Sequence, residues 1–263
     1  MTGTARSIWK GVIRFGGISV PVKLFSAVQD NRVHFRLLHE PDLTPVEQRM
    51  VDPRTGKTVP TEEIRRGLEV ETGEIVMVTP EELEELVPDA SRDIEVTRYV
   101  PRGRINSQWY DRPYYLGPDG GGEDYHALAA ALAGEHREGI VHWTMRKKRY
   151  VGSLHGEDGR LKLVTLRFAD EVVDAEAIPR PEGRAFEPLE LRMAEQLINA
   201  LAGDFNPAEY HDEYRQRVLE LIQVKAAGNV FKFEKPKQRR PKIASLADTL
   251  EQSLSQVEKR KSA

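Results

Sequence analysis

Lysine and arginine are the residues of this chain whose types and spacing best suit chemistry, and that chemistry is the binding of phosphate oxygens. Residues 146–149 (RKKR) are four cations in succession, and residues 232–242 hold six cations against one glutamate. Grouped cations bind nucleic-acid backbones without regard to base order. The pattern therefore indicates sequence-independent binding of a polyanion.

Positive and negative charges are also separated along the chain. The 263 residues carry 39 Lys and Arg against 42 Asp and Glu, so the formal net charge of -3 does not by itself indicate a nucleic-acid partner. Residues 1–39, however, hold six cations against one acid, whereas residues 61–95 hold twelve acids against three cations. We therefore expect segregated basic and acidic surfaces.

The residue types and motif spacings of the chain do not form a recognisable catalytic centre. The chain has no cysteine, which excludes disulfides, thiolate zinc sites and cysteine nucleophiles. Residues 56–58 (GKT) imitate the end of a phosphate-binding loop, but the first glycine of that motif would fall at Val51, and Pro60 blocks the helix that must follow. No serine, histidine and acid stand in a recognisable nucleophile context. We predict a binding protein with no catalytic residues, metal ion or cofactor.

Three other groups have competing interpretations. Residues 211–213 (HDE) suggest a metal cluster, but neighbours on a helix diverge by about 100°, so we favour packing or an interface for them and for Tyr210 and Tyr214. The glutamates of residues 81–85 suit a solvated helix better than a nuclease centre. Several aromatic residues could stack on bases, although core packing or a dimer seam is the better interpretation. They are Trp9, Trp109, Tyr110, Tyr114 and Tyr115.

Strands must position most of these side chains. Alternating apolar residues predict strands at residues 8–15, 18–27, 33–39 and 94–100. Residues 139–169 predict a three-stranded meander with the RKKR run at its first hairpin. If that run is part of a strand, only two of its four side chains can face a ligand. Residues 40–60, with four prolines and a turn at 52–56, predict a protruding piece, followed by paired strands at 68–71 and 74–78.

Helices take over toward the C-terminus. Thr79 and Glu82 form a capping box for a short helix, and a second helix is predicted over about 125–136. Apolar spacing predicts a third over 189–202. Asn206-Pro207 predicts the start of a fourth, which runs to Ala227 and stops at Gly228. Residues 229–263 follow as a basic tail with a weak amphipathic pattern.

Six segments in this order resemble prokaryotic Ku proteins: SIWKGVIRFGGISVPVKLFSA, SRDIEVTRYVP, PYYLGPD, IVHWTMR, LRFADEV and DFNPAEYHDEYRQRVLELIQVK. The resemblance runs from residue 6 to about residue 228. It implies a mixed, mainly β fold: a β-barrel core over 1–185 with an extended strand-rich arm at about 30–80, helices over 186–228, and a flexible basic tail over 229–263 with a possible short helix.

The resemblance also implies a function and partners. Two copies are expected to form a ring that threads onto the ends of double-stranded DNA, without enzymatic activity, and to recruit an ATP-dependent end-joining DNA ligase through the C-terminal region. Charges in the first fifteen residues argue against a secretion signal, and no apolar run is long enough for a membrane span. We therefore expect a cytoplasmic, nucleoid-associated homodimer.

One departure from the family concerns the arm. Many bacterial Ku sequences carry a CxxC pair where this chain has residues 52–55 (DPRT), so a metal-stabilised turn is not expected here. We expect the proline and glycine of this turn to form it alone.

A protein that accepts any DNA end should contact phosphates through Lys and Arg. Each cation alone is as well explained by ordinary solvation, but the set is not. The predicted contacts are Lys10, Lys23, Arg32, Arg36, Arg54, Lys57, Arg65, Arg66, Arg146, Lys147, Lys148 and Arg149, of which Lys23 and Arg66 match basic positions common in the family. In the tail, Lys235, Lys237, Arg239, Arg240 and Lys242 either add DNA affinity or merely solubilise the chain.

Two other functions remain open at this point. An architectural nucleoid protein would also need basic ribbons and a dimer, but it would bind linear and circular DNA equally well. A metal-dependent nuclease would cleave a duplex in the presence of magnesium or manganese.

Overall fold

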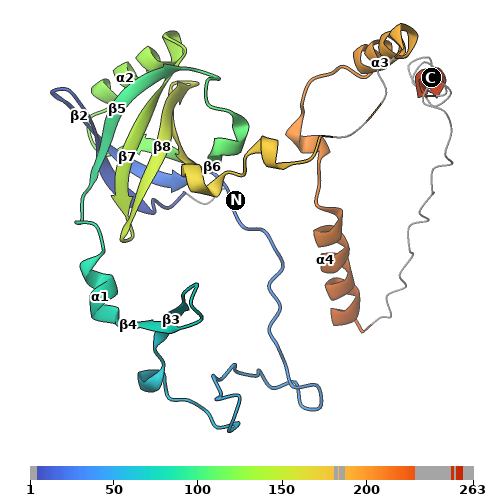
Figure 1. Ribbon diagram of the computed structural model, residues 1–263. Helices are drawn as coiled ribbons and strands as arrows, with labels where there is room; N and C mark the ends of the chain where they lie inside the picture. The colour runs from blue at the N-terminus through green and yellow to red at the C-terminus, as the bar shows by residue number, and fades with distance from the viewer. Residues whose placement is uncertain (1–4, 181–182, 184–186, 229–249, 252, 257–263) are drawn as a thin grey trace. The chain divides into compact units, whose positions relative to one another are not determined.

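The computed structural model describes residues 5–180, 183, 187–228, 250–251 and 253–256. Within these residues, seven strands close into a barrel in the order β1-β2-β6-β9-β8-β7-β5 (Figure 1). The strands are β1 (Trp9–Phe15), β2 (Ile18–Ser26), β5 (Asp93–Pro101), β6 (Tyr110–Pro118), β7 (Arg137–Met145), β8 (Lys148–Glu157) and β9 (Arg160–Leu166). Neighbours are antiparallel except β1 and β5, whose parallel pairing closes the barrel. The predicted mainly β barrel fold is confirmed.

Period-2 alternation fills the barrel interior. The inward-facing residues of β1 and β2 include Ile13, Val22 and Leu24, all fully buried, and Leu154 and Leu161 on the opposite strands are equally buried. Because the alternate positions face outward, the strands carry their lysines and arginines on the outer surface. The cations of the barrel are therefore held on a rigid scaffold.

Helix α2 (Glu123–Gly134) packs against the barrel (Figure 1). The Tyr125 hydroxyl donates to the Leu116 carbonyl at 2.5 Å and accepts from the Leu161 amide at 2.9 Å. A Cβ at Gly156 would lie 2.1 Å from the Ala129 carbonyl oxygen, so only glycine lets the helix come this close. The helix was predicted from its alanine and leucine content.

The chain leaves the barrel after β2 and returns at β5, and residues 36–92 are called the arm below. The arm contains the 3₁₀ turn Thr61–Glu63, β3 (Arg66–Glu69), β4 (Ile75–Val78) and α1 (Pro80–Glu85). The predicted capping box is present, because Thr79 and Glu82 each accept the other's backbone amide. The predicted strand at 33–39 is wrong. An isolated bridge between Leu38 and Pro45 forms there, and within the described part of the chain no strand pairs with this segment.

The described chain divides into two compact units, Met1–Asn31 with Arg36–Ala177, and Arg32–Phe35 with Ile178–Ala263. The second contains α3 (Pro188–Ala200), the 3₁₀ turn Pro207–Glu209 and α4 (Glu213–Ala226), and residues 250–251 and 253–256 are also helical. The predicted helix start at Asn206 is wrong. Asn206 caps only the 3₁₀ turn, and α4 begins later because the Asp212 side chain accepts from the Arg215 amide at 2.9 Å.

Candidate nucleic-acid interface

The β7–β8 hairpin presents the densest group of cations on the barrel. Met145 pairs with Lys148, so Arg146 and Lys147 form a two-residue turn in which both have positive φ, 52° and 65°. The predicted position of the run at the first hairpin of the meander is confirmed: Arg146 and Lys147 form the turn, and Lys148 and Arg149 begin β8. The limit of two ligand-facing side chains applies only to a run that lies wholly within a strand, so it does not hold here. All four side chains of residues 146–149 are exposed around the tip.

The turn conformation is uncommon for these residue types. Such turns favour asparagine and glycine, and a left-handed conformation costs other L-residues roughly 1 kcal/mol each. An arginine and a lysine occupy both positions here. The intrinsic stability of the hairpin turn therefore does not explain these residue types.

Lys147 has a carboxylate partner in the arm. Its Nζ lies 2.5 and 2.7 Å from the two carboxylate oxygens of Glu84 on α1. Beside this contact lies a cavity of about 570 Å³ lined by Trp9, arm residues 87–92 and hairpin residues 144–147. A phosphate approaching Lys147 must compete with Glu84 for the ammonium group.

Lys10 and Lys23 form a second group of lysines that are paired with a carboxylate. They are directly opposite each other on β1 and β2, and their Nζ atoms lie 3.0 and 2.9 Å from the two carboxylate oxygens of Asp119. Hydrogen bonds from Lys23 and Lys10 hold the pKa of Asp119 below its usual value. The group therefore carries one net positive charge while Asp119 remains in place.

The turn of the arm is organised by a carboxylate. One Asp52 oxygen accepts from the Arg54 amide at 2.8 Å and the other from the Thr55 hydroxyl at 2.9 Å. These two bonds lower the pKa of Asp52. The expectation that the proline and glycine form this turn alone is wrong, because the Asp52 carboxylate also holds it. Residues 52–55 contain no cysteine and so offer no thiolate for a metal ion.

The remaining predicted cations differ in how they are engaged. Arg36, Arg54, Lys57 and Arg66 are exposed on the arm, and Arg32 is exposed as well. Arg65 is used locally, because its guanidinium donates to the carbonyls of Glu62 and Ile64. The five predicted tail cations, Lys235, Lys237, Arg239, Arg240 and Lys242, lie outside the described residues.

The aromatic residues mostly pack. Tyr114 is 5% exposed within the core, and Trp9 packs against that core, so the core interpretation is confirmed for these two. Tyr115 is 41% exposed, with the Lys162 ammonium 5.9 Å above its ring centroid. Tyr210 and Tyr214, for which packing or an interface was predicted, are 69% and 75% exposed. The Tyr210 ring stacks on that of Phe205, with the ring centroids 5.4 Å apart, so Tyr210 has a local packing contact, and an interface remains a prediction for both tyrosines.

Sequence reasoning missed a buried polar network on the outer side of β7 and β8. Glu138 is 1% exposed, and one of its oxygens accepts from the hydroxyls of Tyr110, at 2.8 Å, and Ser153. Burial, with the hydrogen bond to Glu138, raises the pKa of Tyr110 to about 12. Burial and the nearby Arg102 guanidinium lower the pKa of His155. No sequence signal singled out Glu138, because the same strand also contains Arg137, His142 and Thr144.

It also missed the carboxylate partners Glu84 and Asp119. Asp119 stands in the PYYLGPD segment, directly after the strand that pairs with Lys23, which was the available signal. Among the residues that the structure describes, no three His, Asp or Glu side chains could together hold a metal ion. In the same residues, no helix has the length and apolar character of a membrane span.

Comparison with known proteins places these observations in a family. Residues 14–193 match the family model described as the Ku70/Ku80 beta-barrel domain. The chain is 39% identical over 252 residues to "Non-homologous end joining protein Ku 2" of Geotalea uraniireducens, covering 95% of this chain and 98% of that protein. It is 35% identical over 228 residues to "Non-homologous end joining protein Ku" of Mycobacterium tuberculosis, covering 85% and 84%. A similar protein of Koribacter versatilis is 35% identical over 258 residues, covering 98% and 88%.

The family-model match covers more than half of the chain, and the matched region includes every strand of the barrel from β2 onward, the end of β1, the whole arm and α2. The relatives extend that similarity over nearly the full length. This protein belongs to the Ku β-barrel family and is homologous to the bacterial Ku proteins.

Proposed function

We propose that this protein binds the ends of broken double-stranded DNA as a ring-shaped homodimer in non-homologous end joining. The names of its relatives support that role. The duplex enters the ring from an end, and Lys and Arg of the barrel and arm contact its phosphates. Because phosphates are the same at every base pair, such binding accepts any end sequence.

The observation that carries the proposal is the exposed apolar surface of the arm. β3 and β4 form an isolated two-stranded sheet, which is marginally stable alone in water. Ile75 and Met77 lie on one face of this ribbon and are each 70% exposed, whereas Leu68 and its directly opposed partner Val76 lie on the other face and are 69% and 50% exposed. Apolar side chains exposed on both faces favour a protein interface, and a second copy with the same arm is the simplest complement, because most homo-oligomers are twofold symmetric.

The proposed chemistry is binding without a reaction. Residues 1–185 hold the duplex through the barrel and arm, and the helices of residues 186–228 with the tail of 229–263 recruit an ATP-dependent DNA ligase. The cations of the β7–β8 hairpin support the first part. The ligase partner is an expectation from the family resemblance.

A comparison of DNA topologies tests the threading claim. The full chain is titrated against a linear duplex with open ends, the same duplex with both ends blocked by streptavidin, and a closed minicircle of the same sequence. Threading predicts tight binding to the open duplex alone. Equal affinity for all three would identify an architectural nucleoid protein and refute the ring.

Two further measurements separate the parts of the proposal. Sedimentation should show a dimer without DNA, and a stable monomer would contradict the ring. Incubation of labelled duplex with magnesium or manganese should leave it intact. Metal-dependent cleavage that disappears when the carboxylates of α1 are replaced by amides would instead identify a nuclease.

A further inference from the structure

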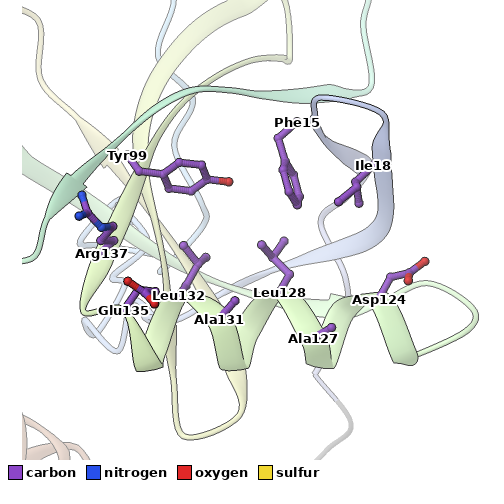
Figure 2. A pocket seen from close by; sticks show the side chains of 10 residues that line it. All are labelled: Phe15, Ile18, Tyr99, Asp124, Ala127, Leu128, Ala131, Leu132, Glu135 and Arg137. Carbon is purple, nitrogen blue, oxygen red and sulfur yellow. The ribbon is translucent and has the colours of Figure 1, made fainter.

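An apolar groove runs along α2, on a part of the barrel that holds none of the cation groups described above. Its cavity measures about 400 Å³. Phe15, Ile18 and Tyr99, from the β1–β2 hairpin and β5, form one wall, and α2 forms the other with Ala127 and Ala131 (Figure 2). A volume of this size lies within the range of about 300–1,000 Å³ typical of ligand sites.

The groove is open to solvent, and its apolar side chains and the Tyr99 hydroxyl are only partly covered by the protomer. Ile18 is 48% exposed and Tyr99 39% exposed. Figure 2 shows the Tyr99 hydroxyl directed over the groove, and within the described residues no hydrogen bond of that hydroxyl is found. Partial burial raises the pKa of Tyr99. Tyrosines that are partly removed from water usually find a hydrogen-bond partner, so the groove lacks a polar contact as well as an apolar one.

Carboxylates mark both ends of the groove. Asp124 lies at one end and Glu135 at the other, with Arg137 beside Glu135 (Figure 2). At 1.5 Å per residue, the two carboxylates are about 16 Å apart along the helix. Within the described residues, neither takes part in a salt bridge, and α2 contains no lysine or arginine.

Helix stability explains only one of these acids. A carboxylate in the first turn, such as Asp124, stabilises a helix, whereas one at the C-terminal end, such as Glu135, is unfavourable. Glu135 is the C-cap residue of α2. Arg137 lies beside it, but within the described residues the two form no salt bridge, so the Glu135 carboxylate is available to an external cation, and the same acidic ends repel a DNA backbone.

We propose that this groove binds an amphipathic helix of a partner protein, which presents aliphatic side chains one turn apart and has lysine or arginine at both ends. Ala127 and Ala131 lie one turn apart on the exposed side of α2, and small residues let two helices approach closely. A stable dimer needs roughly 800 Å² from each partner, so a cavity that holds a few side chains suits a short segment better than a second copy.

A selection experiment identifies the partner chemistry without assuming any partner sequence. A phage-displayed library of helical peptides is selected on the full-length protein and counter-selected on the Ala131→Arg variant, which places a charged side chain in the groove. Ala130→Arg is the matched control, because Ala130 is exposed on α2 but does not line the groove. We expect enrichment of peptides with aliphatic residues three or four apart and cations at both ends.

Binding of the most enriched peptide is then measured by fluorescence anisotropy. Ala131→Arg should weaken it about tenfold or more, and Ala130→Arg should leave it within about twofold. Glu135→Lys should weaken it too, and should strengthen binding of a peptide whose lysines are replaced by glutamates. Circular dichroism of each variant checks that α2 is intact.

Three results would overturn the proposal. One is the absence of any peptide family that the Ala131→Arg variant fails to retain. Another is equal affinity for the lysine-flanked and glutamate-flanked peptides. The third is conversion of the protein to a monomer by Ala131→Arg, which would make the groove a contact between two copies. None of these measurements involves DNA, so failure here is distinguishable from failure of the proposed end binding.

Discussion

Replacement of Glu84 by glutamine should strengthen DNA binding, because it frees Lys147 for phosphate. In the DNA-free protein the Lys147 ammonium lies 2.5 Å from the Glu84 carboxylate. If the same ammonium contacts phosphate in the complex, binding must first break this ion pair. The variant Glu84→Gln removes that cost.

The expected magnitude follows from exposure. The side chains of Lys147 and Glu84 are 62% and 65% exposed, so water screens the pair and its worth is about 0.2–1 kcal/mol. This corresponds to a gain in DNA affinity of roughly 1.4- to 5-fold. The slope of log affinity against log salt should stay the same, because the number of neutralised phosphates is unchanged.

Glu85→Gln is the matched control. Glu85 stands next to Glu84 in the last turn of α1, is exposed, and has no ion pair within the described residues. Both variants change the net charge equally, so the difference between them isolates the contact with Lys147. The assay is a fluorescence-anisotropy titration of linear duplex over a series of salt concentrations. Equal effects of the two variants, or a Glu84→Gln gain that persists in a Lys147→Met background, would refute the reasoning.

Three other perturbations test separate parts of the molecule. Charge reversal at Lys147 and Arg149 should weaken end binding and lower the salt slope by about 0.9 for each lost phosphate contact; an unchanged slope in the titration would remove them from the interface. Gly156→Ala should lower the unfolding free energy by about 1–3 kcal/mol through overpacking against α2, whereas Gly121→Ala, which meets nothing within 4 Å, should leave the thermal midpoint nearly unchanged. The folded-state pKa of Asp52 is depressed, so the turn it fastens should persist above the ordinary value of 3.8 and loosen as the pH falls through the depressed value; NMR shifts of the turn amides that titrate at or above that ordinary value would contradict this.

Six of the seven barrel strands were predictable from the alternation of apolar residues, but their closure into a barrel was expected only from the family resemblance, and β6 was not predicted. The meander predicted over 139–169 corresponds to β7, β8 and β9, and the α2 helix was predicted within about two residues. The same alternation predicted a strand at 33–39 that does not form, because alternation indicates an apolar face but not whether another strand is available for pairing. Phe35 and Leu37 there are 67% and 64% exposed, so their apolar character does not come from a core within the protomer.

The wrong helix start has a local cause in a second capping residue. Asn206 is a genuine cap, since its side chain accepts from the Ala208 amide at 3.2 Å, but a second cap at Asp212 starts the longer helix. The hairpin at the RKKR run was predicted from the apolar strands on either side of it, and the pairing of Met145 with Lys148 confirms it. The positive φ of Arg146 and Lys147 was not predicted, because the run lacks the asparagine or glycine that is typical of such turns.

Long-range ion pairs could not be predicted in the same way. Lys147 and Glu84 are 63 residues apart, and Lys10 and Asp119 are 109 apart. An abundance of acids in the arm predicted a solvated helix, which is correct for α1 as a whole. It did not indicate which carboxylate would lie on which cation, because that depends on how the arm re-enters the barrel at β5.

Both cation groups of the barrel that we propose for DNA are already paired with a carboxylate, Asp119 in one case and Glu84 in the other. Each carboxylate contacts the lysine ammonium group that a phosphate would contact. DNA binding therefore exchanges one anion, the carboxylate, for another, the phosphate. Such an exchange lowers the affinity of each single site for phosphate. Many phosphates must then be engaged together before binding is tight, which an enclosed duplex allows and a brief side-on encounter does not. The carboxylates would thereby favour threaded DNA over intact DNA, and their removal should narrow the affinity ratio between open and closed duplexes.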